Sequence, residues 1–258
     1  KRGIMKVSIV IPTFNEAEGI RDQVLRCLSL DPRPEVLVVD GASEDGTLAQ
    51  ARHAGVTTMA APIRGRAHQM NAGAAIATGD ILIFLHADVT LPQAAYVGMR
   101  HILLNPRVMG GAFRRRFDHA SLLLGLDCRL ADLRGRVLGI FLGDQTMFIR
   151  REVFRHLGGF PEMRLFEDLA LSRKMAAFGA TRLVGAPVIA SGRRFRREGN
   201  LRRLCRDLHL IVQYFAGVDP EVLARRYYPG YFDPHEPLPG GAAAAGRSLG
   251  GKPGEAGS

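Results

Sequence analysis

Short apolar runs alternate with amphipathic stretches over the first half of the chain. The runs near residues 7–12, 35–40, 56–60 and 81–85 are rich in aliphatic side chains and have the length of buried strands. Helical patterns lie between them, and this alternation is typical of a mostly parallel, Rossmann-like sheet with helices on both faces. The pattern therefore predicts an α/β fold.

Beyond Leu104 the alternation is harder to follow. The elements expected there are a strand over 108–117 that carries three arginines, a helix over 121–133, a short strand over 146–149 and a helix over 151–157. A further amphipathic helix is expected after the adjacent acids Glu167 and Asp168, which would lie in its first turn.

The net charge of +10 is concentrated near the C-terminal end of the helical region. Seven arginines in residues 193–206 lead into a helix whose apolar residues share one face at three- and four-residue spacing: Leu201, Leu204, Leu208, Ile211 and Phe215. Two interpretations are open. The face packs on the core and the basic side is solvated, or the helix meets anionic lipid or a phosphorylated acceptor.

Length and composition agree with one α/β core and a small appendage, because the chain has 258 residues and is 47% hydrophobic. Cys27, Cys128 and Cys205 show no metal-ligand spacing, so we expect reduced structural thiols and a cytoplasmic location. The first residues lead into a strand too short for a signal-peptide core, and no apolar run approaches the ~20 residues of a spanning helix.

Carboxylates follow several of the predicted strands. Asp88 comes after the run 81–85, Asp40 closes the run 35–40, and Glu16 follows the first strand. Ligands of open α/β sheets collect at the carboxyl ends of strands, so these acids are candidates for contact with a metal or a substrate hydroxyl. Each placement also has an explanation in turn or capping chemistry.

Taken in order, these pieces resemble the inverting family 2 glycosyltransferases, which have the nucleotide-diphospho-sugar-binding GT-A fold. The matching pieces are Pro12-Thr13-Phe14-Asn15-Glu16, Asp40-Gly41, Asp45-Gly46-Thr47, Asn71-Ala72-Gly73, Ala77-Thr78-Gly79-Asp80, His86-Ala87-Asp88, Gly158-Gly159-Phe160 and Glu167-Asp168. They cover roughly residues 5–190, and the order is more specific than any single piece. Gly65-Arg66-Ala67, Leu85 through Asp88 and Gly143-Asp144-Gln145 resemble a bacterial subgroup whose genes often accompany radical-SAM and selenodomain proteins.

We expect three parts. By the resemblance, residues 1–190 would form the GT-A catalytic domain. Charge and apolar spacing make residues 191–233 a basic amphipathic helical part that would face an acceptor or a membrane, and the Gly/Ala/Pro composition of residues 234–258 predicts a disordered tail.

The resemblance also implies a hexosyltransferase-like enzyme that moves a sugar from a nucleotide-diphospho-sugar to an acceptor hydroxyl with inversion. Asp168 matches the general base, and Asp88 the ligand of Mg²⁺ or Mn²⁺. Residues expected to bind the nucleotide-sugar are Pro12, Phe14, Glu16, Asp40, Arg66 and Asp88, although Arg66 also reads as a solvated loop arginine. Residues expected to face the diphosphate or the acceptor are His86, Asp144, Glu167, Arg193 and Arg194.

Two departures from the family pattern bear on the metal. Many relatives have Asp-x-Asp where this chain has His86-Ala87-Asp88, and relatives often supply a histidine ligand where this chain has Ser191-Gly192-Arg193-Arg194-Phe195. Arginine cannot bind a cation, but it can pair directly with a diphosphate.

Other classes fit less well. The chain lacks the Gly-x-Gly-x-x-Gly of a dinucleotide-dependent oxidoreductase, a P-loop, and the glycine-rich loop of a sugar nucleotidyltransferase. The alternative is a basic protein that binds anionic membrane or nucleic acid without catalysis. The arginines do not alternate with aromatic residues, so we expect no nucleic-acid partner, whereas peripheral contact with an anionic membrane stays open.

Overall fold

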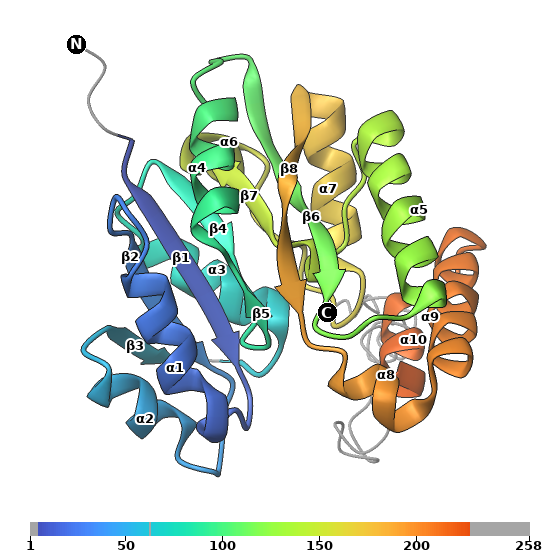
Figure 1. Ribbon diagram of the computed structural model, residues 1–258, viewed down its shortest axis with the longest axis horizontal. Coiled ribbons are helices and arrows are strands. Elements are labelled where there is room, and N and C mark those ends of the chain that lie inside the picture. The colour runs from blue at the N-terminus through green and yellow to red at the C-terminus, as the bar shows by residue number, and fades with distance from the viewer. Residues whose placement is uncertain (1–4, 62, 228–258) are drawn as a thin grey trace, which may run out of the picture.

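The computed structural model describes residues 5–61 and 63–227. Its strands are β1 (Val7–Thr13), β2 (Glu35–Asp40), β3 (Thr57–Ala60), β4 (Ile81–Phe84), β5 (Val89–Thr90), β6 (Val108–Phe117), β7 (Met147–Arg150) and β8 (Ala180–Ala190). Its helices are α1 (Ala17–Leu28), α2 (Thr47–His53), α3 (Arg66–Ile76), α4 (Gln93–Ile102), α5 (Leu122–Leu138), the 3-10 turn η1 (Gly143–Gln145), α6 (Arg151–His156), α7 (Glu167–Phe178), α8 (Arg193–Glu198), α9 (Asn200–Phe215) and α10 (Pro220–Tyr227). The strands form one sheet in the order β3-β2-β1-β4-β7-β6-β8-β5 (Figure 1).

The first half of the sheet is parallel, as predicted. β1 pairs in parallel with both β2 and β4, and β2 pairs in parallel with β3. The register sets Thr13 beside Asp40, so the carboxyl ends of β1 and β2 meet at one edge. The strand-end residues expected to form a site are therefore brought to the same side of the molecule.

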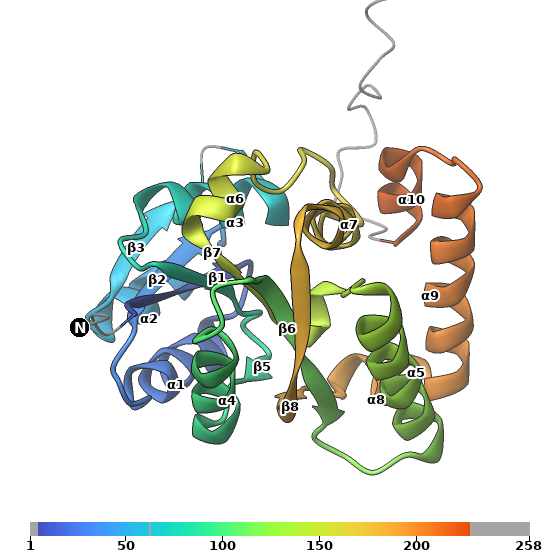
Figure 2. The ribbon, with the colours of Figure 1, turned by 90° about the horizontal axis from the view of Figure 1, so that it is seen from above.

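Helices cover both faces of the sheet, which confirms the α/β prediction (Figure 2). Along β1, Ile9 and Ile11 pack with residues of α1 and α4 on one face, while Val10 packs with residues of α3 and α6 on the other. Side chains of successive strand residues point to opposite faces, so a continuous apolar run serves two cores.

The second half of the sheet is mixed. β7 runs antiparallel to both β4 and β6, whereas β6 and β8 are parallel with two register shifts. The strand expected over 108–117 is present, and the helix expected over 121–133 continues as α5 to Leu138, where Gly139 ends it with φ of 64°.

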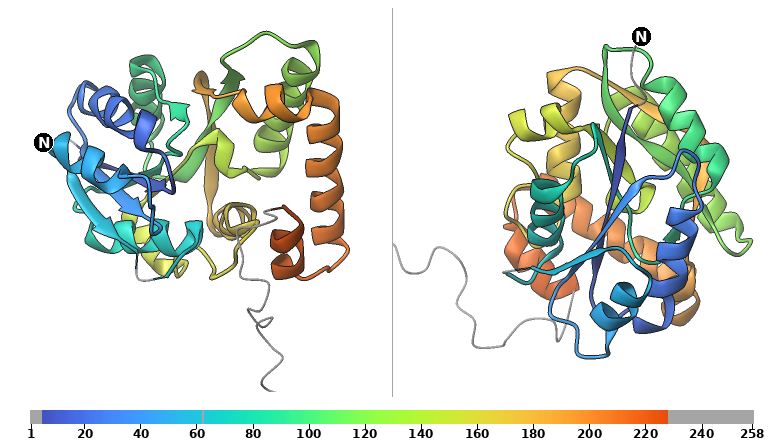
Figure 3. Two further views of the ribbon diagram at one scale, coloured as in Figure 1. Left: turned by 90° about the horizontal axis from the view of Figure 1, so that it is seen from below. Right: turned by 90° about the vertical axis from the view of Figure 1, so that its left-hand side faces the viewer.

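The basic C-terminal segment forms α8, α9 and α10. α8 connects the end of β8 to α9, and α9 lies on the far side of α5 from the sheet (Figure 3). The apolar face predicted for α9 is not packed into the core: Leu201, Leu208 and Phe215 are exposed, whereas Leu210 and Arg203 are buried. The helix instead joins a third small cluster through Leu210, with Leu223 of α10 and Leu169 of α7. The predicted disordered tail, 234–258, lies outside the described residues.

No helix among residues 5–61 and 63–227 is both long enough and apolar enough to cross a membrane.

Candidate active site

A cavity of about 790 Å³ opens at the carboxyl ends of β1 and β4. Nine of the residues expected from the sequence line it: Pro12, Phe14, Glu16, Arg66, His86, Asp88, Asp144, Asp168 and Arg194. Three others, Asp40, Glu167 and Arg193, do not appear in its lining. The structure thus gathers side chains from six separate segments around one space.

Glu16 and Asp88 are two acids of the same wall. Glu16 is the residue before α1, and burial together with repulsion from Asp88 raises its pKa, against the attraction of Arg193 and Arg194. The Asp88 carboxylate makes no hydrogen bond or ion pair with any other described residue, although its backbone carbonyl accepts a hydrogen bond from Ser191 N–H at 3.0 Å. The two acids therefore leave carboxylate oxygens available to a ligand of the cavity.

Asp168 and His86 meet at Gly143. Asp168 is buried in the first turn of α7, and its Oδ2 accepts the backbone N–H of Gly143. A Cβ on Gly143 would lie 2.8 Å from Asp168 Oδ2 and 3.0 Å from His86 Nε2, so any larger residue there would force one of these side chains to move. Burial, and then Arg66, lower the pKa of His86 well below its ordinary value, which leaves a neutral imidazole at neutral pH.

Glu167 lies outside the lining of the main cavity and pairs with Arg66. The Arg66 Nε lies 2.9 Å from Glu167 Oε1, and Glu167 is only 1% exposed. Burial raises the pKa of Glu167, Arg66 lowers it, and neighbouring Asp168 raises it again. The like-charge effect expected for the Glu-Asp pair thus acts on Glu167. Arg66 is fixed by an ion pair and is not the solvated loop arginine of the alternative interpretation.

Asp40 serves the turn that follows β2. Its carboxylate is buried and accepts hydrogen bonds from Ser43 Oγ at 2.6 Å, Ser43 N–H at 2.8 Å and Thr13 Oγ1 at 3.1 Å. This network fixes the wall that carries Phe14, whose ring lies 3.9 Å from the guanidinium carbon of Arg64.

The other side of the cavity holds residues that the sequence did not single out. Buried Arg115 of β6 pairs with Asp127 of α5 and with the predicted residue Asp144. Arg134 of α5 donates to Gln145 Oε1 at 2.8 Å and to the Ile140 carbonyl at 3.2 Å. The signal for Arg115 was its place in the strand 108–117, where alternation sets it on the same face as Phe113 and Phe117.

The arginines of α8 approach from the end of β8. Arg194 lines the cavity and has no hydrogen-bond or ion-pair partner among the described residues, whereas Arg193 Nη2 lies 3.9 Å from Glu16 Oε2. Asp118, just after β6, anchors this helix by accepting from Arg196 and from Gly192 N–H, each at 2.9 Å.

A metal site made of protein ligands alone is not apparent, since the described residues contain no group of three His, Cys, Asp or Glu side chains placed to hold an ion. The Asp88 carboxylate fits a cation that is bound together with a phosphorylated ligand. Hard divalent cations bound with phosphates commonly take one or two carboxylates and complete their coordination with phosphate oxygens and water.

Comparison with known proteins agrees with this geometry. The family model "Glycosyl transferase family 2" matches residues 8–158. Among solved structures, a mannosyltransferase from Pyrobaculum calidifontis in complex with GDP-Man and Mn²⁺ superposes with a TM-score of 0.61 at 26% identity, over 72% of this chain and 56% of that one. The sheet, the helices and this likeness establish the GT-A fold.

Curated relatives match over shorter stretches. The uncharacterized glycosyltransferase YfnE of Bacillus subtilis is 37% identical over 92 residues, which are 33% of this chain and 24% of that protein. The undecaprenyl-phosphate 4-deoxy-4-formamido-L-arabinose transferase of Sodalis glossinidius is 36% identical over 100 residues, 34% of this chain and 31% of that protein.

The matched stretches thus span about a third or less of either curated relative. The family model, by contrast, covers more than half of this chain and contains the strand-end residues of the cavity. The chain belongs to glycosyl transferase family 2.

Proposed function

We propose that the enzyme transfers a sugar from a nucleotide-diphospho-sugar to an acceptor hydroxyl with inversion, and that Asp168 is the general base. The observation that carries this proposal is the buried Asp168 carboxylate, held by Gly143 N–H at the wall of the cavity. Both of its oxygens accept backbone N–H groups, Oδ2 from Gly143 and Oδ1 from Leu169 at 2.6 Å, so the carboxylate is held in one orientation beside the cavity.

In this reaction the bond between the anomeric carbon and the diphosphate breaks, and a bond to the acceptor oxygen forms on the opposite face. The acceptor proton passes to Asp168. Charge grows on the departing diphosphate, and Arg194, which has no partner among the described residues, would stabilise it. His86 stays neutral because its pKa is lowered, so it would act as a hydrogen-bonding group and not as a cation.

The donor would lie along the wall formed by Pro12, Phe14 and Glu16, with Asp40 fixing that wall from behind. Asp88 would hold Mg²⁺ or Mn²⁺, which neutralises diphosphate charge when bound. The Pyrobaculum enzyme, whose structure contains GDP-Man and Mn²⁺, supports this class of donor and cation. We also propose that the chain belongs to the bacterial subgroup that its sequence motifs resemble, whose genes often accompany radical-SAM and selenodomain proteins.

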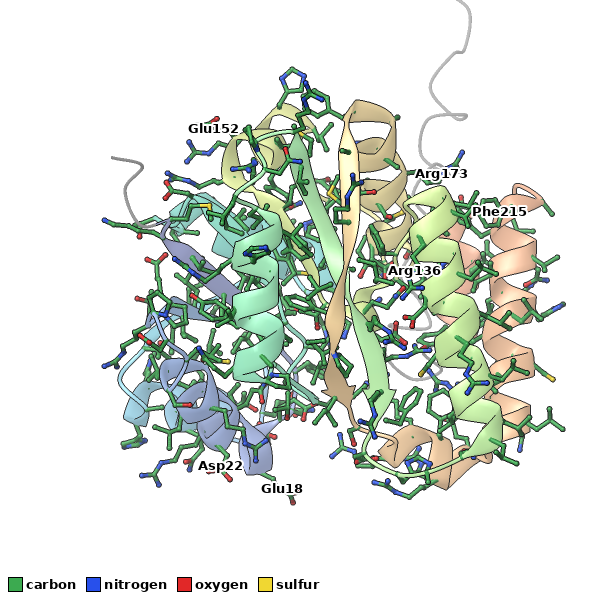
Figure 4. All side chains as sticks on the ribbon, turned by 45° about the horizontal axis from the view of Figure 1, so that its top comes forward. Glu18, Asp22, Arg136, Glu152, Arg173 and Phe215 are labelled. Carbon is green, nitrogen blue, oxygen red and sulfur yellow. The ribbon has the colours of Figure 1, made fainter. Side chains whose placement is uncertain are left out.

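Donor binding is tested by thermal shift with UDP-, GDP- and dTDP-sugars, with and without Mn²⁺, because a ligand that binds the folded state raises the melting temperature. Asp88→Ala is expected to remove the Mn²⁺-dependent part of the shift and to abolish transfer, while the melting temperature without ligand stays unchanged. Asp22→Ala, an exposed acid of α1 labelled in Figure 4, is the matched control.

Two results would count against this assignment. Full transfer activity in Asp88→Ala would remove the metal role, and absence of a shift with every donor would remove the nucleotide-sugar. The alternative, a basic protein that binds anionic surfaces without catalysis, is favoured by the exposed face of α9. It predicts salt-sensitive retention on heparin together with no nucleotide-sugar binding.

A further inference from the structure

The cavity does not end at the predicted catalytic residues. From Asp168 and Arg115 it continues between α5 and α9, where its lining becomes apolar. We call this part the leucine groove; its walls are Leu123, Leu126 and Leu130 of α5 and Leu204, Leu208 and Ile211 of α9. The hydroxyls and phosphates of a sugar or nucleotide would find no hydrogen-bond partner against such a wall, so neither molecule is complementary to it.

The groove opens onto an apolar surface of the same two helices. Leu122, Leu133 and Val137 of α5 and Leu201, Val212 and Phe215 of α9 are all more than half exposed. Figure 4 labels Phe215 on α9; Arg173 of α7 contacts its ring at 5.8 Å. Contiguous exposed apolar side chains at helical spacing on two neighbouring helices mark an interaction site, not ordinary surface.

The charge around the groove is positive. Each acid on the two helices is paired with an arginine: Asp127 with Arg115, Asp132 with Arg114, and Asp207 with Arg203. The exposed arginines Arg129, Arg136 and Arg202 pair with no acid among the described residues, so the surface beside the groove favours anions.

Arg134 stands where the apolar and polar parts of the cavity join. Its guanidinium donates hydrogen bonds to two neutral oxygens, the Ile140 carbonyl and Gln145 Oε1, and forms no ion pair with an acid of the described residues. Burial, and then repulsion from Arg115, lower its pKa, against the attraction of Asp127 and Asp168. A partly buried cation of this kind gains a partner when an anionic group enters.

We propose that the acceptor is an anionic amphiphile, with its apolar chain in the leucine groove, its anionic group at Arg134 and its reacting hydroxyl at Asp168. This rests on the proposed function, because the groove is assigned as the acceptor side of the same cavity. A second copy of the chain is less suited to bind in the groove, because two such faces would bring like-charged arginines together.

The first test is calorimetry of the full chain with hexyl, octyl and decyl phosphate below their micellar concentrations. One molecule should bind per chain, and affinity should rise about fourfold per methylene, the factor that corresponds to ~0.8 kcal/mol for each buried CH₂. Affinity that does not depend on chain length would overturn the proposal.

The second test compares two double variants on the same helices. Leu126→Gln with Leu208→Gln changes the groove, whereas Leu122→Gln with Leu201→Gln changes exposed leucines that do not line the cavity. Only the first pair should weaken decyl phosphate binding, by tenfold or more. Equal loss in both pairs, or light scattering that shows a dimer dispersed by both, would overturn the groove assignment in favour of a general surface or a second copy.

The third test concerns the charge. Arg134→Gln should reduce binding of decyl phosphate but leave binding of uncharged decyl maltoside, whereas a purely structural role would weaken both. Donor thermal shifts are measured on every variant. If they persist while no amphiphile binds, the acceptor proposal fails and the proposed function stands; if they are absent in the wild type, the proposed function itself fails.

Discussion

At the scale of single residues, Gly143 decides how the centre of the site is built. Its lack of a Cβ lets the Asp168 carboxylate and the His86 ring approach the same backbone segment. Because the lowered pKa of His86 keeps the imidazole neutral, Asp168 has no imidazolium partner at neutral pH. A carboxylate that backbone N–H groups hold in place, with no ion-pair partner among the described residues, is positioned to accept a proton from an acceptor hydroxyl.

Asp168→Asn is expected to leave donor binding nearly unchanged and to lower kcat by roughly two to four powers of ten, the usual contribution of a positioned base. The asparagine carbonyl can still accept one of the two backbone N–H groups that hold the carboxylate, from Gly143 or from Leu169, so the melting temperature should fall only by a few degrees. Donor affinity, turnover and melting temperature are measured on the same preparation. Near-normal turnover would rule out Asp168 as the base.

Glu167→Gln, unlike Asp168→Asn, is expected to lower the free energy of unfolding. It breaks the buried ion pair with Arg66 and leaves a cation beside an amide, at a cost on the order of 2 kcal/mol. Denaturant titration should show the lower free energy of unfolding. A variant with unchanged stability would mean that Arg66 finds another acceptor of equal strength.

The strand-end acids were predictable because parallel strands bring their carboxyl ends together whatever the loops do. Asp88 and Glu16 therefore came to one wall from sequence pattern alone. Arg115 and Arg134 were not predictable, since they reach the cavity from β6 and α5, whose places depend on the antiparallel pairing around β7. No local pattern near either arginine specifies that pairing.

At the scale of elements, the strands most regular in sequence were those buried on both faces. β8 was not expected because it runs beside β6 with a bulge, carries Gly185 and Pro187, and buries only part of its length. The apolar spacing of α9 was found correctly, yet it did not reveal that most of that face is exposed. Periodicity identifies an apolar face but not what covers it.

Asp118→Ala is expected to raise the donor KM about tenfold, the effect of losing charged hydrogen bonds of ~1.5 kcal/mol at the anchor of α8. Although burial opposes it, hydrogen bonds from Arg196, His119 and Gly192 N–H hold the pKa of Asp118 at about 2. Because this pKa is depressed, the anchor is complete above about pH 4 and weakens as the pH falls toward 2.

Steady-state kinetics at neutral pH measures the effect of Asp118→Ala. Arg194→Gln should reproduce the higher KM, because Arg194 is the arginine of α8 that lines the cavity. Arg197→Gln, an exposed neighbour outside the lining, is the control and should not change it. If Asp118→Ala keeps the wild-type KM, α8 does not depend on this anchor.

At the scale of the whole molecule, the cavity lies where two kinds of sheet meet. The parallel half supplies Glu16 and Asp88, and the mixed half with α5 and α9 supplies Arg115 and the leucine groove. The two halves also differ in burial, since the core beneath α1 is closed while α5 and α9 expose apolar side chains. Local opening should therefore begin at the α5 and α9 side.

The three cysteines report this difference. Cys205 of α9 is exposed, Cys128 of α5 is partly buried, and Cys27 of α1 lies in the first core. Burial raises the pKa of Cys27 to about 12, with a smaller opposing effect from Arg26, so its thiolate is scarce in the native state.

With a chromogenic disulfide at pH 8, Cys205 should react first, Cys128 more slowly, and Cys27 only at the rate of global unfolding. Single-cysteine variants assign each phase, and urea should accelerate the Cys27 phase most steeply because its reaction exposes the most surface. Native labelling of Cys27 as fast as that of Cys205 would show that the sheet's first core opens locally, contrary to its burial.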